Sequence, residues 1–365
     1  MHLFSILRNN SKTFVDIYFS RFVLIFLFSL CIMRIISHIF VTVGASSSVI
    51  NGTFDDRGIF RFPITARIES SRADVVASVF LDFHGSHDFR LAPVYRPIQT
   101  DMADGYRFDG QTDFIHTEPF EIPTGSDPDV DGWIGAAFHS RFFDTFDHFI
   151  IAPRDRQSGL LVLNPPRPEE YALDGQWVYT TSSDLLYPQV MASVVVGNDS
   201  IATTPAVFSL VSSSDTTWIP HEAFRKIVHH LELAGFTISG RVAGIPSSTR
   251  PVDPASIGRG RQVIVNGNMD SLAHETIRIP RLSAAELAQI LPRIHFDIVA
   301  DENQSVRLSL YPEDYIHSTH EESFISIGAR RRGHYSIATN LLRRLALHID
   351  ARDRRIGFAE PVTEI

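Results

Sequence analysis

The chain has 365 residues, of which 44% are hydrophobic and 21% are charged. This balance supports a large apolar core, in one two-lobed unit or in two domains, and it excludes an intrinsically disordered chain. Residues 1–45 contribute +3 to the formal net charge of −9, which leaves −12 for the rest of the chain. So acidic a domain disfavours a phosphate-binding surface, and we expect no nucleic acid partner.

A hydrophobic leader is the first element in chain order. Phe22–Met33 is an apolar run behind three basic residues, and Arg34 interrupts it. The run is shorter than the roughly 20 residues that a membrane-spanning helix needs, and it is typical of a signal peptide. We therefore expect residues 1–45 to be a signal peptide cleaved near Ala45 or a retained signal anchor; the third alternative is neither. Both of the first two deliver residues 46–365 to the secretory pathway, as a secreted or a single-pass membrane protein with its domain outside or in the lumen.

The pattern after the leader indicates a mainly β protein with a few short helices. Short runs of Val, Ile, Phe and Leu alternate with turn residues, as where Val190–Val196 precedes Gly197, and such runs are typical of β-strands. Helical periodicity is confined to short stretches, notably Glu222–Leu233 and Ala284–Leu291.

The segment from Val79 to Ser86 reads Val-Phe-Leu-Asp-Phe-His-Gly-Ser, a hydrophobic strand that ends at Asp82. It resembles the first catalytic strand and turn of the pepsin-like aspartic peptidases, in which such a strand delivers Asp-Thr-Gly-Ser to the cleft. Asp82 is kept, whereas Phe83 and His84 replace the Thr and the Gly. The resemblance implies that Asp82 is one catalytic carboxylate; the alternative is an Asp retained only to stabilise the turn.

This chain has no carboxylate at the catalytic position of the segment that resembles the family's second motif. Ser209–Pro220 stands in its place. An alignment without a gap before Pro220 puts Val211 at the catalytic position, and a one-residue deletion puts Ser212 there. Asp215 lies too far along the turn to substitute. Because the aspartic mechanism needs two facing carboxyls that share a proton, one as base and one as acid, the resemblance implies an inactive homologue.

Further landmarks of the family follow in its order between about residues 57 and 362. They are Asp131–Ala136, Phe149–Leu163, Pro220–Phe224, Leu291–Phe296, Leu308–Ile316 and Ile349–Ala359. The chain departs from the pattern at Ser336–Thr339, where the family usually has Ile-Leu-Gly-Asp. The segment between Asp82 and Asp131 is also short for one that should hold the substrate-covering flap, and its last Tyr is Tyr106. The resemblance implies a bilobal pepsin-like fold for residues 46–365, with an N-lobe at about 50–178 and a C-lobe at about 179–365. In this fold residues 79–89 and 208–220 are expected to meet.

We expect a pepsin-like homologue that has lost peptidase activity and binds a polypeptide in its cleft. One alternative is a divergent aspartic endopeptidase that uses Asp82 with an unrecognised second acid. Another is a structural or cell-surface interaction protein. We expect a monomer without a cofactor, and membrane contact only through the N-terminus. We also expect no metal, since the pair His317 and His320 has no third ligand at a recognisable spacing.

Overall fold

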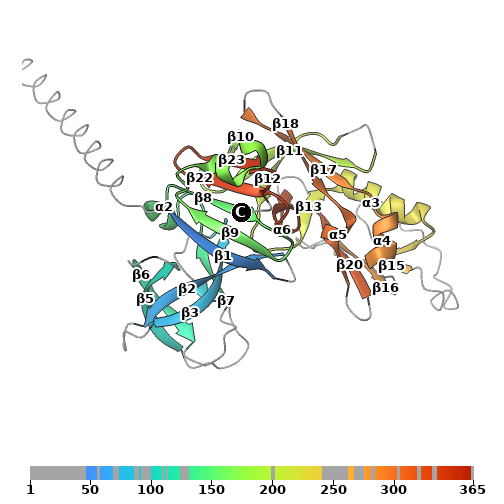
Figure 1. Cartoon of the computed structure of the whole chain (residues 1–365). Helices are drawn as coiled ribbons and strands as arrows, with labels where there is room; N and C mark the ends of the chain where they lie inside the picture. Colours follow the sequence, from blue (N-terminus) through green and yellow to red (C-terminus); the bar gives the residue numbers. More distant parts are fainter. Residues whose placement is uncertain are drawn as a thin grey trace, which may run out of the picture. The chain divides into compact units, whose positions relative to one another are not determined.

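The computed structural model describes residues 47–55, 58–68, 74–85, 90–91, 100–108, 111, 114–123, 131–198, 202–240, 262–266, 275–280, 284–301, 305–318, 322–330 and 335–362. They belong to one compact unit that begins at Ser47, and the predicted leader lies outside them. Within these ranges no helix has the length and apolar character needed to cross a bilayer. The described chain forms two large sheets with a few short helices (Figure 1), which confirms the prediction of a mainly β protein.

The first sheet has twelve strands, including two from the C-terminus. They are β1 (Ser48–Phe54), β2 (Phe60–Ile68), β3 (Asp74–Asp82), β4 (Arg90–Leu91), β5 (Thr100–Phe108), β6 (Ile115–Pro123), β7 (Asp131–Gly135), β8 (His148–Pro153), β9 (Ser158–Leu163), β10 (Val178–Thr181), β22 (Ala346–Asp350) and β23 (Arg355–Ala359). Their order is β10-β23-β22-β8-β9-β1-β2-β3-β7-β4, with β5 paired to β2 and β6. The C-terminal hairpin β22–β23 therefore lies between β8 and β10, and the predicted boundary at residues 178 and 179 falls within β10.

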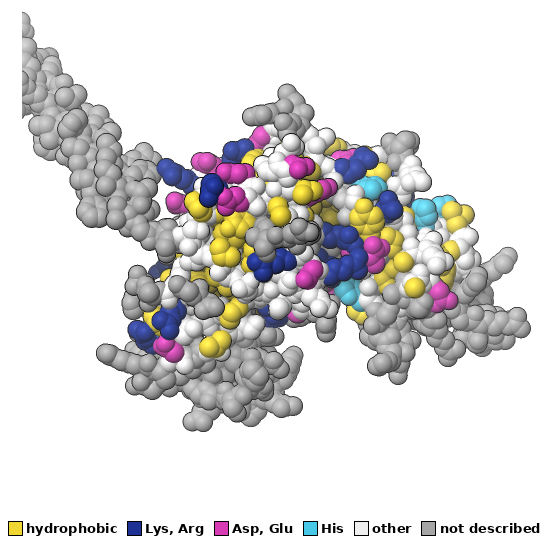
Figure 2. Space-filling model, in the orientation of Figure 1, with side chains coloured by type: hydrophobic (Ala, Val, Ile, Leu, Met, Phe, Trp, Pro, Cys, Tyr) yellow, Lys and Arg dark blue, Asp and Glu magenta, His cyan; other side chains and the backbone are white. Residues whose placement is uncertain are grey.

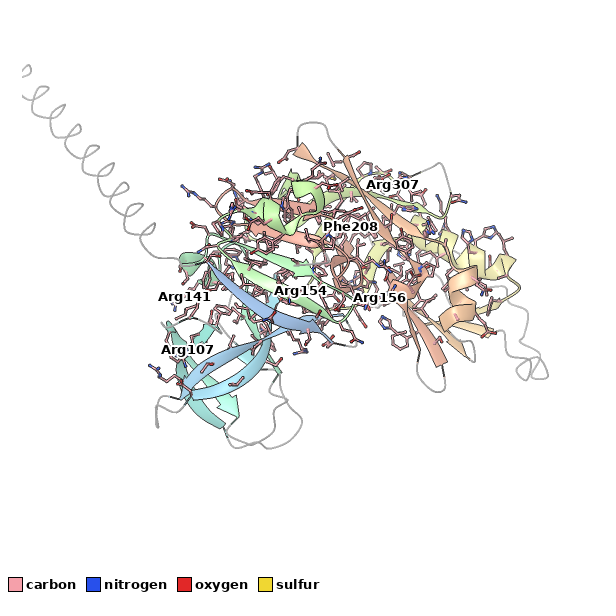
Figure 3. All side chains as sticks on the ribbon, viewed as in Figure 1. Arg107, Arg141, Arg154, Arg156, Phe208 and Arg307 are labelled. Carbon is pink, nitrogen blue, oxygen red and sulfur yellow. The ribbon has the colours of Figure 1, made fainter. Side chains whose placement is uncertain are left out.

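The second sheet has eleven strands. They are β11 (Gln189–Val196), β12 (Ala206–Leu210), β13 (Thr217–Pro220), β14 (Thr237–Gly240), β15 (Gln262–Asn266), β16 (Glu275–Pro280), β17 (Ile294–Val299), β18 (Ser305–Leu310), β19 (Ile316–Ser318), β20 (Glu322–Arg330) and β21 (Tyr335–Ile337). Their order is β14-β15-β16-β20-β13-β21-β12-β11-β17-β18, with β19 paired to β20. Phe208 of β12 (Figure 3) is fully buried and packs edge-on against Phe296 of β17, with ring centroids 5.6 Å apart.

Both helical stretches predicted from periodicity are present. The helices are α2 (Phe142–Thr145), α3 (His221–Leu233), α4 (Ala284–Ile290), α5 (Pro312–Tyr315) and α6 (Thr339–Leu342), with 3-10 turns η1 (Pro168–Tyr171) and η2 (Leu173–Gly175). Helix α3 follows Pro220 directly and buries one stripe of side chains at helical spacing, namely Ala223, Phe224, Ile227, Val228 and Leu231.

An ion-pair network connects helix α5 with the turn between β8 and β9. Asp314 is 1% exposed and lies 2.5 Å from Nε of Arg344, while Glu313 lies 3.3 Å from Arg344 and 3.6 Å from Arg156. Figure 2 shows dark blue and magenta side chains together in this region, where Figure 3 labels Arg156. The buried Asp314 carboxylate is therefore compensated by Arg343 and Arg344, as a buried charge requires.

Three rings linked by hydrogen bonds connect β22 of the C-terminal hairpin with its neighbouring strands β8 and β10. The hydroxyl of Tyr179 lies 2.9 Å from Nδ1 of His348, and Nε2 of His348 lies 2.9 Å from Nδ1 of His148. Burial lowers the pKa of His348 to about 3 and also lowers the pKa of His148. Both imidazoles are therefore neutral at neutral pH, and each has one donor and one acceptor nitrogen for this chain of bonds.

The buried His348 predicts a loss of stability in acid. Its pKa is about 3 in the folded chain against 6.5 when exposed, so the unfolded chain binds more protons between these values. The stabilisation is complete above pH 6.5 and falls as the pH drops towards 3, by on the order of 4 kcal/mol. We expect urea unfolding of the full-length chain to show this loss between pH 7.5 and pH 4, and His348→Gln to reduce the slope.

His229→Gln is the matched control, because His229 has an exposed side chain on α3. It should leave the pH dependence as it is in the natural chain. An unchanged slope in His348→Gln would contradict the assignment of the acid sensitivity to this ring.

Candidate functional site

Asp82 ends β3 in a tight turn. Its carboxylate Oδ1 accepts a hydrogen bond from the backbone N–H of His84 at 3.1 Å, and its carbonyl accepts from Gly85 at 3.0 Å and Ala136 at 2.8 Å. A Cβ on Gly85 would lie 3.0 Å from Oδ2 of Asp82 and 3.1 Å from Cα of Gly135. A side chain at position 85 would therefore press on both the carboxylate and the neighbouring strand, which explains the glycine.

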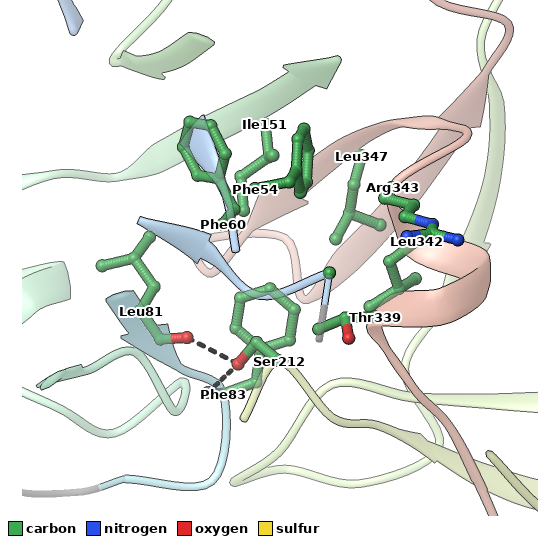
Figure 4. A pocket seen from close by; sticks show the side chains of 11 residues that line it. Phe54, Phe60, Leu81, Phe83, Ile151, Ser212, Thr339, Leu342, Arg343 and Leu347 are labelled. Atoms are coloured by element: carbon green, nitrogen blue, oxygen red, sulfur yellow. Dashed lines mark hydrogen bonds between the residues drawn. The ribbon is translucent and has the colours of Figure 1, made fainter. Parts of the chain in front are cut away.

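Ser212 holds the backbone on both sides of Asp82. Its buried hydroxyl donates to the carbonyl of Leu81 at 2.5 Å and accepts from the N–H of Phe83 at 3.1 Å (Figure 4). The loop after β12 thus contacts the turn after β3, which confirms that the two predicted segments meet. The two bonds satisfy a donor and an acceptor, which limits how far the turn can shift.

The strand registers identify the residue that corresponds to Asp82 in the second sheet. β3 pairs in parallel with β7, where Leu81 lies opposite Ile134. β12 pairs in parallel with β21, where Leu210 lies opposite Ile337. Both sheets therefore contain one parallel strand pair whose first strand leads into the loops that meet at Ser212.

Val211 takes the place equivalent to Asp82 by this register, because each residue directly follows its leucine. The N–H of Val211 donates to the carbonyl of Ile337 at 2.9 Å and continues the β12–β21 pairing. The sequence leaves Val211 and Ser212 as alternatives for this position, and the register favours Val211. The hydroxyl of Ser212 is committed to the backbone beside Asp82.

The carboxylate of Asp215 is bonded within its own loop and lies beside His317. Thr216 Oγ1 donates to Asp215 Oδ1 at 3.1 Å, and Nε2 of His317 lies 3.9 Å from Asp215 Oδ2. His317 in turn stacks on Phe324 with centroids 5.1 Å apart. Burial lowers the pKa of His317, and the Asp215 carboxylate opposes this shift. Of the His317 and His320 pair, for which no metal is expected, His317 contacts Asp215 and Phe324, and His320 lies outside the described residues.

An uncharged network supports the loop that carries Val211. Thr217 Oγ1 donates to Asn340 Oδ1 at 2.7 Å, and Asn340 Nδ2 donates to the carbonyl of Ser326 at 3.3 Å. Thr339, where the resembled family usually has Asp, donates its hydroxyl to the carbonyl of Ser214 at 2.9 Å. Neutral groups thus stabilise this loop through hydrogen bonds.

An aromatic cluster lies next to the Asp82 turn. The ring of His84 stacks on Tyr187 with centroids 5.3 Å apart, and His139 meets Tyr187 edge-on at 5.7 Å. Burial lowers the pKa of His84, although the nearby carboxylates of Asp82 and Asp184 act in the opposite direction. Sequence analysis missed Tyr187 and His139, and the one available signal was the replacement of the family's small Gly by His84.

Two other features do not form a binding site. A pocket of about 30 Å³ lies behind Ser212, between Phe60, Leu347 and Arg343 (Figure 4), and this volume has room for water rather than a peptide side chain. Tyr106 is 1% exposed and packs edge-on against Phe108, so it belongs to the core of the first sheet. Among the described residues, no group of three or more His, Cys, Asp or Glu is arranged to hold a metal ion.

The Ser212 hydroxyl predicts a measurable loss of stability on Ser212→Ala. The variant leaves the N–H of Phe83 and the carbonyl of Leu81 without this partner, which costs about 1–3 kcal/mol for such buried groups. Ser213→Ala is the matched control, because Ser213 is exposed and such surface changes stay within about 0.5 kcal/mol. Urea unfolding of both variants measures the difference, and equal midpoints would contradict a structural role for Ser212.

Comparisons with protein-family models and with curated proteins find no match for this chain. The geometry around Asp82 therefore carries the functional conclusion. Its main elements are the Ser212 contact, the uncharged residue at position 211 and the aromatic cluster on Tyr187.

Proposed function

We propose that residues 46–365 have the bilobal fold of the pepsin-like aspartic peptidases, that this member has lost peptidase activity, and that the surface around Asp82 binds a polypeptide. The observation that carries the proposal is the register equivalence of Asp82 and Val211, in two loops joined by Ser212. The sequence landmarks of the family and the hydrophobic leader support it, and the leader assigns the domain to the secretory pathway.

The strand arrangement supports this fold. Each of the two sheets contains a parallel strand pair that ends at the same place, next to Ser212. The C-terminal hairpin β22–β23 returns to the first sheet, where β22 pairs with β8 and β23 pairs with β10. These long-range pairings join the two halves of the chain, as a bilobal peptidase fold requires.

The loss of activity follows from the missing carboxylate. A shared proton needs two acids so close that both cannot ionise, and one then acts as base towards water while the other acts as acid. An isopropyl group at Val211 can neither share nor transfer a proton. The carboxylate of Asp215 is bonded to Thr216 and lies beside His317. We therefore do not propose Asp215 as the second acid for Asp82.

Peptide hydrolysis is the direct test. We expect no new peptides when the full-length chain is incubated with denatured protein between pH 3 and pH 6 and the mixture is analysed by mass spectrometry. Products that disappear in Asp82→Asn would overturn the proposed inactivity and identify a divergent endopeptidase. Products that persist in Asp82→Asn come from a contaminating peptidase.

Restoring an acid tests the proposed facing positions. In Val211→Asp the new carboxyl should meet the carboxyl of Asp82, so the two should titrate as a pair with apparent pKa values separated by about one unit or more. Val211→Asn is the isosteric control, and NMR titration of the carboxyl carbons provides the measurement. Independent titration of the two acids would show that positions 82 and 211 do not face each other.

A further inference from the structure

The segment between β10 and β11 exposes two adjacent leucines next to the Asp82 turn. Leu185 is 68% exposed and Leu186 is 45% exposed. Leu185 and Leu186 are adjacent, so they expose more contiguous apolar surface than a single side chain would.

Hydrogen bonds fix the loop that carries these leucines. Asp184 Oδ1 accepts from the N–H groups of Leu186 at 2.7 Å and Tyr187 at 3.2 Å. The N–H of Phe138 donates to the carbonyl of Leu186 at 2.8 Å, and the hydroxyl of Ser182 donates to the carbonyl of Tyr187 at 2.9 Å. The leucines are therefore presented by an ordered loop, so a partner would lose little affinity to the ordering of this segment.

Tyr187 connects the leucines to Asp82. It directly follows Leu186 and stacks on His84, two residues after Asp82. The carboxylates of Asp82 and Asp184 both lie near enough to His84 to act on its pKa. Through Tyr187 and His84 the exposed leucines are linked to the two carboxylates. We name these residues the Leu-Leu surface and define it as Asp82, His84, Asp184, Leu185, Leu186 and Tyr187.

The charge of the Leu-Leu surface selects its partner. Neither Asp82 nor Asp184 forms an ion pair with a Lys or Arg of the described chain. Complementary charge steers association and suppresses partners of like charge. A second copy of this acidic chain is disfavoured for that reason, whereas a basic residue beside an apolar residue matches the surface.

We propose that the Leu-Leu surface binds a segment of another protein that carries Arg or Lys next to an apolar side chain. The proposal rests on the proposed function, an inactive domain that binds polypeptide, and it specifies the chemistry of the bound segment. The apolar side chain packs on Leu185 and Leu186, and the cation lies between the carboxylates of Asp82 and Asp184.

Two matched peptides test the proposal with the full-length chain. The first is N-acetylated and C-amidated Ser-Gly-Leu-Arg-Phe-Leu-Gly-Ser, and the second has Glu in place of Arg. By isothermal titration calorimetry at low salt, we expect the Arg peptide to bind at least tenfold more tightly than the Glu peptide. The double variant Leu185→Ser, Leu186→Ser should weaken binding of the Arg peptide about tenfold.

Further variants separate the charge from the loop structure. Asp184→Asn keeps an oxygen that can accept the loop's hydrogen bonds, so it should reduce the preference for Arg over Glu without unfolding the loop. Leu233→Ser and Asp353→Asn are the controls, because Leu233 is 72% exposed on α3 and Asp353 is exposed in the β22–β23 turn. Both controls should bind the Arg peptide as the natural chain does.

Equal binding of the two peptides, or binding that is indifferent to the double leucine variant, would overturn the proposal and leave the proposed inactivity intact. Concentration-dependent dimers in analytical ultracentrifugation that the leucine variant abolishes would overturn it in favour of a second copy. Cleavage of the Arg peptide, seen by mass spectrometry of the same samples, would overturn the inactivity instead. Failure of both peptides to bind would overturn this inference alone, because the proposed function covers polypeptide segments of other composition.

Discussion

The hydroxyl of Ser212 sets the geometry on which the candidate site depends. It binds the carbonyl before Asp82 and the N–H after it, so the position of the Asp82 turn is tied to the loop that follows β12. A buried hydroxyl with both a donor and an acceptor partner is difficult to displace, because moving either loop leaves a buried polar group unsatisfied. Val211 directly precedes Ser212, and its place in the site follows from the same two bonds.

The proposed lack of a second acid fits the surroundings of Val211. An ionised carboxylate on a buried loop needs donors or a partner that shares its proton. The loop that carries Val211 is stabilised instead by neutral hydrogen bonds of Thr217, Asn340 and Thr339. On the other side, Phe83 and His84 replace the small residues of an active turn. Asp215 is the acid of the loop that carries Val211, and its carboxylate is bonded to Thr216 and lies beside His317, which agrees with the proposed lack of an acid at position 211.

Much of the scaffold could be predicted from the sequence, and the choice of residues within the site could not. Strand runs and the apolar stripe of α3 are local patterns, so the mainly β class and the helix near Glu222 were accessible. The choice between Val211 and Ser212 depends on strand register, and a sequence alone does not show which strands pair or in which register. The contact of Tyr187 with His84 joins segments far apart in the sequence, and no local pattern encodes it.

The proposed loss of one acid also changes what Asp82 can recognise. In a facing pair the shared proton holds the charge between the two carboxyls, where it serves proton transfer. With Val211 in the proposed facing position, the Asp82 carboxylate has no such partner, and its attraction for a cation is available for binding. The neutral ring of His84 does not cancel it, because burial disfavours the protonated imidazole. The proposed binding site therefore extends from Asp82 towards the ordered segment that carries Tyr187, and not across to the loop that carries Val211.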